Sequence, residues 1–112
     1  MLAGLATVFG TTFLRCEVEG DSMEPTLHHG DRVLFRRRFP RRQIAPGDIV
    51  AFNDPREGEH RLVMKRVHAV DGESVTVLGD NASASTDSRV FGPIPVNEIT
   101  WLLVRRYHQG DA

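Results

Sequence analysis

Turn-forming residues divide this chain into short segments, and their spacing constrains the fold more than any other feature of the sequence. Gly, Pro, Asn and Asp cluster at Gly30-Asp31, Pro46-Gly47-Asp48, Asn53-Asp54-Pro55, Asp71-Gly72, Gly79-Asp80-Asn81 and Gly92-Pro93. The runs between these turns are short and rich in residues that favour strands. No run after residue 15 shows a helical period. The sequence therefore predicts a small, mostly β domain.

The individual strands can be placed between these turns. They are expected at residues 14–18, 32–35, 48–52, 62–70, 74–78 and 99–105. Asp71-Gly72 separates two of them by a short turn, which is the pattern of a β-hairpin. Cys16 falls on an apolar strand, and Trp101 and Leu103 share one face of the last strand. These three residues are expected in the core.

Size and composition limit the class of protein. The 112 residues suffice for one domain with a real core, but not comfortably for two. Apolar residues make up 40% of the chain and the formal net charge is -1, so no global field attracts nucleic acid or a membrane. The single cysteine excludes an internal disulfide and a cysteine-based zinc site. This is compatible with a reducing, cytoplasmic location.

The N-terminal residues 1–14 are almost all apolar or small and end at Arg15. They lack a basic leading region, and they are shorter than the roughly 20 apolar residues that span a membrane as a helix. We expect residues 1–15 to form a helix or strand that packs on a single domain at residues 16–112. The alternatives are a segment that touches a membrane surface and a remnant of a longer anchor.

A candidate nucleophile lies in the segment Gly20-Asp21-Ser22-Met23-Glu24-Pro25-Thr26-Leu27. Its lack of regular periodicity predicts an ordered loop, where catalytic residues tend to lie. A serine hydroxyl becomes an effective nucleophile when a neighbouring group takes its proton. Ser22 is therefore a candidate nucleophile, and the alternative is an ordinary turn serine.

A candidate base for this serine is Lys65. Alternation along the strand at 62–70 places it on the same face as Val63, Val67 and Ala69. Burial on such a face would lower the lysine pKa and let the neutral amine act as a general base. The alternative is a lysine that reaches solvent from a strand edge.

A third element is the polar loop at residues 79–92, which is rich in small hydroxyl side chains. Asp87 and Arg89 are close enough in sequence to form a local ion pair. The lysine amine can be held on its target by a hydrogen bond from one of several hydroxyl residues, namely Ser83, Ser85, Thr86 or Ser88. A generic turn explains any one of these residues, but it explains the whole pattern poorly.

Together these segments resemble the signal peptidase I family of serine–lysine proteases, in the family's own order. Ser22-Met23-x-Pro25-Thr26-Leu27 resembles its nucleophile box, and Gly47-Asp48-Ile49-Val50-Ala51-Phe52 resembles the strand box that follows. Lys65-Arg66-Val67 resembles the base box, and Gly79-Asp80-Asn81 with Ser85-x-Asp87-Ser88-Arg89-x-x-Gly92 resembles the last box. The resemblance runs from about residue 18 to residue 99, and it implies a signal-peptidase/LexA-like catalytic β domain.

The resemblance implies a role for each matched residue. Ser22 is the implied nucleophile and Lys65 the implied base, with no cofactor. Ser85 is implied to orient the lysine, and Asp87 and Arg89 are implied to form a structural pair. The backbone N–H of Ser22 is one implied oxyanion donor. Some members add a serine hydroxyl two residues before the nucleophile, where this chain has Gly20, so the second donor stays unassigned.

Two departures refine the resemblance. Secretory signal peptidases usually carry a spanning anchor before the nucleophile box, and the apolar run here is too short. Many bacterial members also insert a sizeable β region where this chain has only a hairpin between Lys65 and Gly79. The compact pattern resembles the nickel-type superoxide dismutase maturation protease. The implied substrate is the N-terminal extension of the dismutase proenzyme, and the nickel belongs to that substrate.

Several alternatives remain open at this point. One is a signal peptidase that cleaves leader peptides of secreted proteins, with membrane association. Others are a self-cleaving repressor core and an inactive peptide-binding module. The arginine cluster at residues 36–42 is expected to be a solvated loop, with substrate docking as the alternative and nucleic-acid binding disfavoured for lack of aromatic residues. The scattered histidines are not expected to bind a metal.

Overall fold

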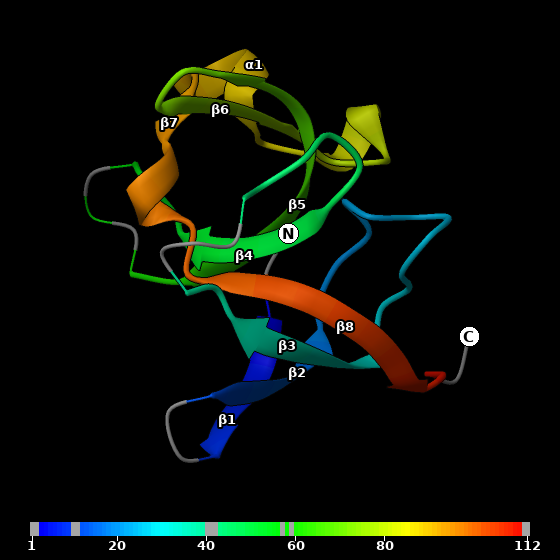
Figure 1. Ribbon diagram of the computed structural model, residues 1–112. Coiled ribbons are helices and arrows are strands. Elements are labelled where there is room, and N and C mark those ends of the chain that lie inside the picture. Colours follow the sequence, from blue (N-terminus) through cyan, green and yellow to red (C-terminus); the bar gives the residue numbers. More distant parts are fainter. Residues whose placement is uncertain (1–2, 10–11, 40–42, 57, 59, 111–112) are drawn as a thin grey trace.

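The computed structural model describes residues 3–9, 12–39, 43–56, 58 and 60–110. Within these residues, eight strands form one antiparallel sheet in the order β1-β2-β3-β8-β4-β5-β6-β7 (Figure 1). The strands are β1 (Ala3–Phe9), β2 (Phe13–Val18), β3 (Arg32–Arg37), β4 (Ile49–Asn53), β5 (Leu62–Asp71), β6 (Ser74–Leu78), β7 (Ile94–Pro95) and β8 (Trp101–His108). The helical turns are η1 (Ala82–Ala84), α1 (Ser88–Phe91) and η2 (Val96–Glu98).

The mostly β class and the predicted strands are confirmed, with differences at the strand ends. The N-terminal apolar segment takes one of its two expected forms, because β1 is a strand that pairs with β2 in the same sheet. Four short elements were missed, namely β7, α1, η1 and η2. β7 is only two residues long and contains a proline, and α1 is a single turn, so neither is long enough to show a periodicity.

The predicted hairpin is formed by β5 and β6. Asp71 pairs with Ser74 across the turn, and Gly72 has a φ of 60°, a backbone conformation that glycine adopts without steric cost. This tight connection makes β6 the direct neighbour of the strand that carries Lys65. The segment after β6 therefore returns over that strand.

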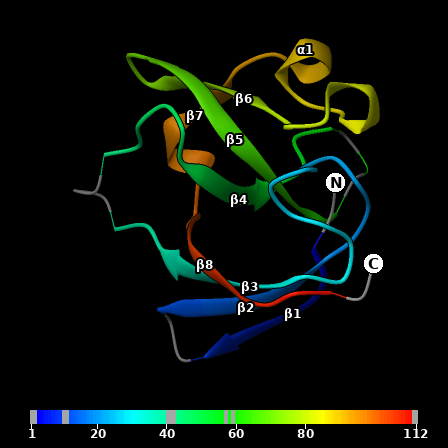
Figure 2. The ribbon, with the colours of Figure 1, turned by 90° about the vertical axis from the view of Figure 1, so that its right-hand side faces the viewer.

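The sheet curves around the core (Figure 1, Figure 2), which consists of two apolar clusters, and both β4 and β8 contribute residues to each cluster. The first contains Leu14, Cys16, Val18, Met23, Leu27, Val33, Phe35, Ile49, Ala51, Met64 and Trp101. The second contains Ile44, Val50, Phe52, Val63, Val67, Val75, Val77, Ile94, Ile99 and Leu102. Because side chains alternate along a strand, β5 gives Met64 to the first cluster and Val63 and Val67 to the second. The core positions expected for Cys16 and Trp101 are confirmed, and Leu103 packs against the first cluster.

A buried carboxylate anchors the end of β8 to the loop between β2 and β3. Asp31 is fully buried and accepts the backbone N–H groups of His28 at 2.8 Å and Gly110 at 2.7 Å. The Arg106 guanidinium donates to the same carboxylate at 3.2 Å. Burial acts to raise the pKa of Asp31, but these three donors outweigh it and lower the pKa. The carboxylate of Asp31 thus joins the loop to the segment around Arg106 and Gly110.

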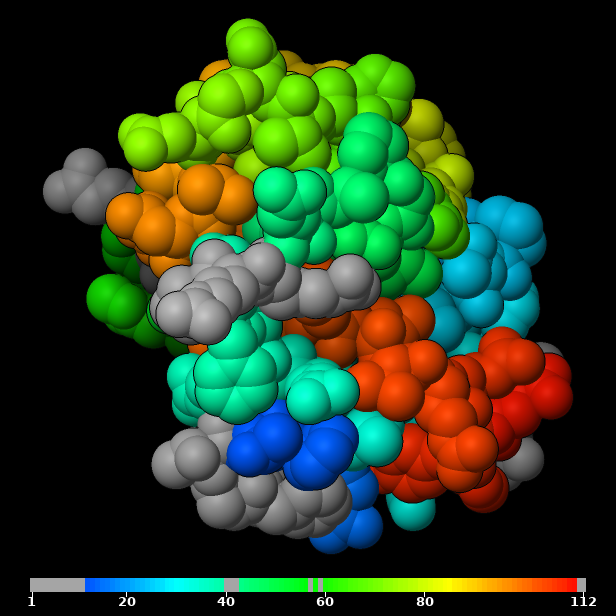
Figure 3. All heavy atoms as spheres, in the orientation of Figure 1, coloured from blue at the N-terminus to red at the C-terminus, as the bar shows by residue number. Residues whose placement is uncertain are grey.

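The described part of the arginine cluster, residues 36–39, begins within β3 beside β8, so Arg36 and Arg37 belong to a strand and not to the expected loop. The Arg37 guanidinium stands 4.7 Å from the centre of the Trp101 ring, and Arg38 donates to the carbonyl oxygens of Ile99 and Val96, each at 3.0 Å. Figure 3 shows this teal segment meeting the orange-red surface of β8. Part of the predicted loop, residues 40–42, lies outside the described residues. None of the described helices is long and apolar enough to cross a membrane.

We expect Phe35→Ala to destabilise the fold by about 3–5 kcal/mol, the usual cost of removing a buried aromatic side chain. Phe35 is fully buried in the first cluster. Urea unfolding followed by the fluorescence of the single tryptophan measures the change. The matched control is Val104→Ala on half-exposed β8, which should change stability by no more than about 0.5 kcal/mol. Equal effects of the two substitutions would contradict the assignment of this core.

Candidate active site

The loop between β2 and β3 holds Ser22 in a buried position. Ser22 is 2% exposed, and the turn that follows it is closed by backbone hydrogen bonds from Thr26 and Leu27 to the carbonyl of Met23, each at 2.9 Å. Met23 and Leu27 both belong to the first apolar cluster, so their burial fastens the loop to the domain. The prediction of an ordered loop for this segment is therefore confirmed.

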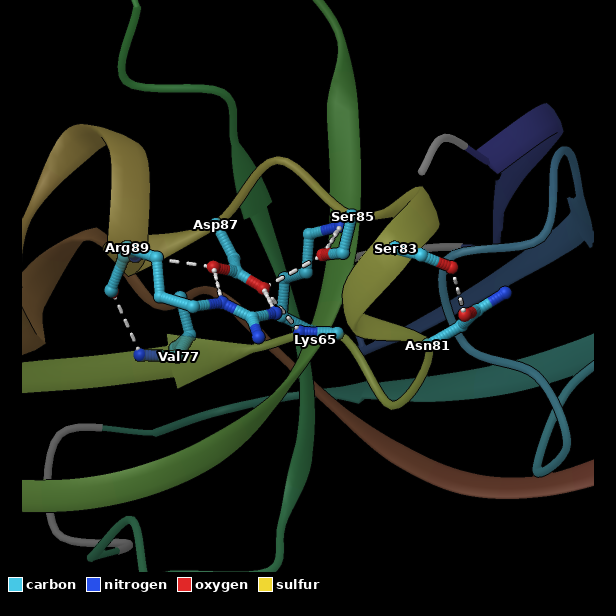
Figure 4. Close-up of polar contacts among 9 residues, drawn as sticks. Lys65, Val77, Asn81, Ser83, Ser85, Asp87 and Arg89 are labelled. Atoms are coloured by element: carbon cyan, nitrogen blue, oxygen red, sulfur yellow. Dashed lines mark hydrogen bonds and ion pairs between the residues drawn. The ribbon is translucent and has the colours of Figure 1, made fainter.

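Lys65 is buried on β5, with 1% of its surface exposed. The two neighbours on its face, Val63 and Val67, are in the second cluster. Its Nζ donates a hydrogen bond to Ser85 Oγ at 3.1 Å (Figure 4). Burial lowers the pKa of the Lys65 ammonium, and the charges of Asp87 and Asp54 only partly oppose this. The alternative of a lysine that reaches solvent is wrong, because the amine is enclosed.

Asp87 is the centre of the loop that holds the lysine. Its carboxylate is fully buried and accepts hydrogen bonds from Gly79 N–H at 2.8 Å, from Ser85 Oγ at 2.8 Å and from Arg89 N–H at 3.1 Å. The Arg89 guanidinium donates to both carboxylate oxygens, with Nε at 2.9 Å (Figure 4). Burial acts to raise the pKa of Asp87, but these donors hold it well below its usual range. Asp87 is thus ionised at neutral pH.

Gly79 lets the lysine-bearing half of the site approach the serine loop. A Cβ atom on Gly79 would lie 2.1 Å from Ser85 Oγ and 2.8 Å from the carbonyl oxygen of Ser22. Both distances are shorter than real Cβ contacts, so only glycine fits here. Ser22 and Ser85, which come from two separate segments, therefore both pack closely against Gly79. In the described part of the chain, no hydrogen bond joins Ser22 Oγ directly to the Lys65 amine.

Among the hydroxyl residues considered for the lysine, Ser85 is the one that contacts it. Ser83 Oγ instead donates to Asn81 Oδ1 at 3.1 Å, and Ser88 Oγ accepts the Val77 backbone N–H at 2.9 Å (Figure 4). Sequence alone could not choose between them, because each is polar, small and in the same loop. The choice is made by the path of the backbone after β6.

An ion pair that sequence reasoning missed, together with its hydrogen bonds, connects all four of the motifs. The Arg66 guanidinium donates to both oxygens of Asp80, each at 2.8 Å, and to the carbonyl oxygen of Gly47 at 2.8 Å. Thr26 Oγ1 donates to Asp80 at 2.6 Å. These bonds join the serine loop, the segment before β4, β5 and the segment after β6. The available signal was Arg66, a charged residue beside Lys65 on a strand that is otherwise largely apolar.

Gly20 occupies the position at which some members of the resembled family carry an additional oxyanion donor. Its backbone N–H donates to His29 Nδ1 at 3.0 Å, so that N–H is already engaged. His28 pairs with Glu24 at 2.8 Å on the exposed side of the same loop. The histidines therefore support the loop. In the part of the chain that the structure describes, no group of three or more His, Cys, Asp or Glu residues is placed to hold a metal ion.

Comparison with known proteins places this geometry in a family context. Residues 1–77 match the family model described as "Signal peptidase, peptidase S26". The match includes the serine loop and the strand with Lys65, and it ends before the loop that contains Ser85 and Asp87. The assignment of that last loop to the site is therefore supported by its own hydrogen bonds and by the motif quoted above.

Curated relatives agree with the family model. The mitochondrial ATP-independent inner membrane protease subunit 1a of Arabidopsis thaliana is 36% identical over 106 residues, which is 73% of this chain and 62% of the relative. The human mitochondrial inner membrane protease subunit 1 is 32% identical over 98 residues, 68% of this chain and 58% of the relative. Signal peptidase I V of Bacillus subtilis is 34% identical over 124 aligned positions, 88% of this chain and 71% of the relative. The chain thus spans about three-fifths of the length of these mitochondrial relatives.

We expect Asp87→Asn to destabilise the protein more at pH 6 than at pH 3. The folded-state pKa of Asp87 is lowered, so its stabilising effect is complete above the unfolded-state pKa of about 4 and is lost as the pH falls below that value. Urea unfolding of both proteins at the two pH values measures the difference. Asp71→Asn, at the exposed end of β5, is the control and should change stability little at either pH. A destabilisation by Asp87→Asn that is equal or larger at pH 3 would contradict this role.

Proposed function

Because the chain belongs to the signal peptidase family, peptidase S26, we propose that it is a serine endopeptidase with Ser22 as nucleophile and Lys65 as general base. The family is a family of serine proteases. The proposal pairs these two residues in one catalytic dyad. It is supported by their burial and by the contacts of the lysine amine.

The observation that carries the proposal is the environment of the Lys65 amine. Its pKa is lowered by burial, which favours the neutral form that can accept a proton. Ser85 Oγ lies between this amine and the Asp87 carboxylate. Since an ionised carboxylate only accepts hydrogen bonds, the Ser85 hydroxyl hydrogen points to Asp87. Ser85 can then only accept from the lysine, and the lone pair of the neutral amine stays free for Ser22.

The proposed reaction follows from this arrangement. Ser22 Oγ attacks the scissile carbonyl carbon while Lys65 Nζ takes the hydroxyl proton, and the backbone N–H of Ser22 donates to the developing oxyanion. The tetrahedral intermediate collapses when Lys65 returns the proton to the leaving amine, which leaves an acyl group on Ser22. A water molecule, deprotonated by Lys65, then attacks the acyl carbon. The second collapse releases the acid and returns the proton to Ser22.

For the substrate, we propose the N-terminal extension of a precursor protein, with the nickel superoxide dismutase proenzyme as the first candidate. The short β5–β6 hairpin between Lys65 and Gly79 supports this choice, together with the loop sequence that follows it. A leader peptide of a secreted protein is the second candidate. It is favoured by the similarity to a bacterial signal peptidase.

We expect the protein to trim the dismutase precursor at one site, and we expect Ser22→Ala and Lys65→Ala to abolish the cleavage. Each variant removes one member of the dyad, and a dyad without its nucleophile or base loses several orders of magnitude in rate. Intact-mass analysis of the incubated precursor measures the product. The control is Val104→Ala, which lies on exposed β8 and should cleave normally. Cleavage of a secretory leader peptide but not of the precursor would select the second substrate, and activity of the Ser22→Ala variant would exclude the mechanism.

We also expect kcat/KM to rise with pH along a limb that lies below the ordinary lysine pKa of about 10.4. The limb reports the free enzyme's base, and burial lowers the pKa of Lys65. Initial rates on a peptide substrate between pH 5 and pH 10, analysed for a single ionisation, test this. A limb at or above the ordinary lysine value would show that the amine is not held neutral, and it would remove Lys65 from the role of base.

A further inference from the structure

Asn81 contacts the backbone on both sides of Ser22. It belongs to the last motif, but none of the roles described above is assigned to it. Its backbone N–H donates to the carbonyl oxygen of Ser22 at 2.8 Å, and its side-chain Nδ2 donates to the carbonyl oxygen of Asp21 at 3.1 Å. Asn81 therefore holds the carbonyl groups of both peptide units that flank the Ser22 Cα atom. These two contacts cross from the segment after β6 to the loop between β2 and β3.

The Asp21 carbonyl sets the direction of the Ser22 N–H, and it accepts from two donors, the Asn81 side-chain amide at 3.1 Å and the Glu24 backbone N–H at 3.2 Å. The carbonyl of Asp21 and the N–H of Ser22 belong to one planar peptide unit, and in a trans peptide they point in opposite directions. A donor that holds the carbonyl therefore aims the N–H away from Asn81. Within the described residues, the Ser22 N–H donates to no protein acceptor, so it remains available to a substrate.

The orientation of the Asn81 amide is determined by its partners. The carbonyl oxygen of Asp21 can only accept, so the side-chain nitrogen must face it, and Asn81 Oδ1 receives the Ser83 hydroxyl at 3.1 Å. The Asn81 backbone is itself fixed, because its carbonyl accepts the Ala84 N–H at 3.0 Å. The preceding residue, Asp80, accepts hydrogen bonds from Arg66 and Thr26. The Asn81 amide, whose contact with Ser83 is drawn in Figure 4, thus reaches Asp21 from a backbone that is itself held in place.

We propose that Asn81 is a positioning residue that sets the oxyanion-binding N–H of Ser22, and this inference rests on the proposed function. Asn81 does not supply an oxyanion hydrogen bond itself, because its amide lies on the carbonyl side of the peptide, opposite to the N–H. Its bond also polarises that peptide unit, which strengthens the N–H as a donor. The positioned N–H would stabilise the oxyanion formed from the scissile carbonyl of any peptide that Ser22 attacks.

The test compares Asn81→Ala and Asn81→Asp with the unmodified protein. The alanine variant removes the side-chain donor to Asp21, and it keeps the backbone bonds from Asn81 to Ser22 and from Glu24 to Asp21. The aspartate variant keeps the side-chain shape but replaces the donor with an acceptor. We expect kcat to fall by about tenfold with KM unchanged, less than the loss of about 10²–10³ on deleting an oxyanion donor itself. The matched control is Asn97→Ala in η2, an exposed asparagine that should leave all constants unchanged.

Inhibitor binding separates positioning from a general loosening of the loop. A substrate-derived peptide aldehyde forms a tetrahedral adduct with Ser22 that carries the oxyanion, whereas the corresponding peptide alcohol binds without forming that adduct. We expect the affinity for the aldehyde to fall by the same factor as kcat/KM, and the affinity for the alcohol to stay constant. Equal losses for both inhibitors, or an unchanged kcat, would overturn the inference.

Two further measurements keep the outcomes distinct. Thermal unfolding checks that each variant is folded, and if Asn81→Ala is not, the isosteric Asn81→Asp variant decides the question. The unmodified protein and Ser22→Ala are assayed in parallel. If the unmodified protein cleaves, Ser22→Ala does not and the Asn81 variants behave as unmodified, only the role of Asn81 is excluded. If the unmodified protein neither cleaves nor binds the aldehyde, the proposed function fails and this inference with it.

Discussion

The buried carboxylate of Asp87 is the interaction on which the rest of the site depends. An anion with no exposed surface must be compensated, and here Gly79, Ser85 and Arg89 supply the donors. Satisfying Asp87 folds the segment after β6 back over β5 and directs the Ser85 hydroxyl away from the lysine. The charge therefore shapes the loop and also decides which partner the lysine can have. A neutral side chain of the same size would leave both undetermined.

Much of the fold could be predicted from sequence because its signals are local. Turn residues marked the strand ends, and alternation along β5 identified the face of Lys65 before its burial was known. Ser22, Lys65, Ser85, Asp87 and Arg89 could be named as candidates because a family motif lists their order. Short elements such as β7 escaped notice, since two residues carry no periodicity and their pairing is decided by packing.

The remaining features depend on contacts between distant segments, which a single sequence does not display. Arg66 gave no sign of its bond to Asp80, and the need for glycine at position 79 follows only from the approach of Ser22 and Ser85. The same holds for Asn81, whose two contacts lie in a loop about 60 positions away along the chain. Such pairs are specified by the sheet order, in which β8 enters between β3 and β4 and brings the two halves together.

The position of β5 between two apolar clusters has a consequence for the life of the protein in a cell. Met64 belongs to one cluster and the neighbours of Lys65 to the other, so the lysine loses its dry surroundings if either cluster is incomplete. In water the amine is protonated at neutral pH and cannot serve as a base. Under the proposed chemistry, a nascent or heat-damaged copy is therefore harmless to the proteins around it. Under the same proposal, Lys65 can act as a base only after β8 has joined the sheet and both apolar clusters are complete.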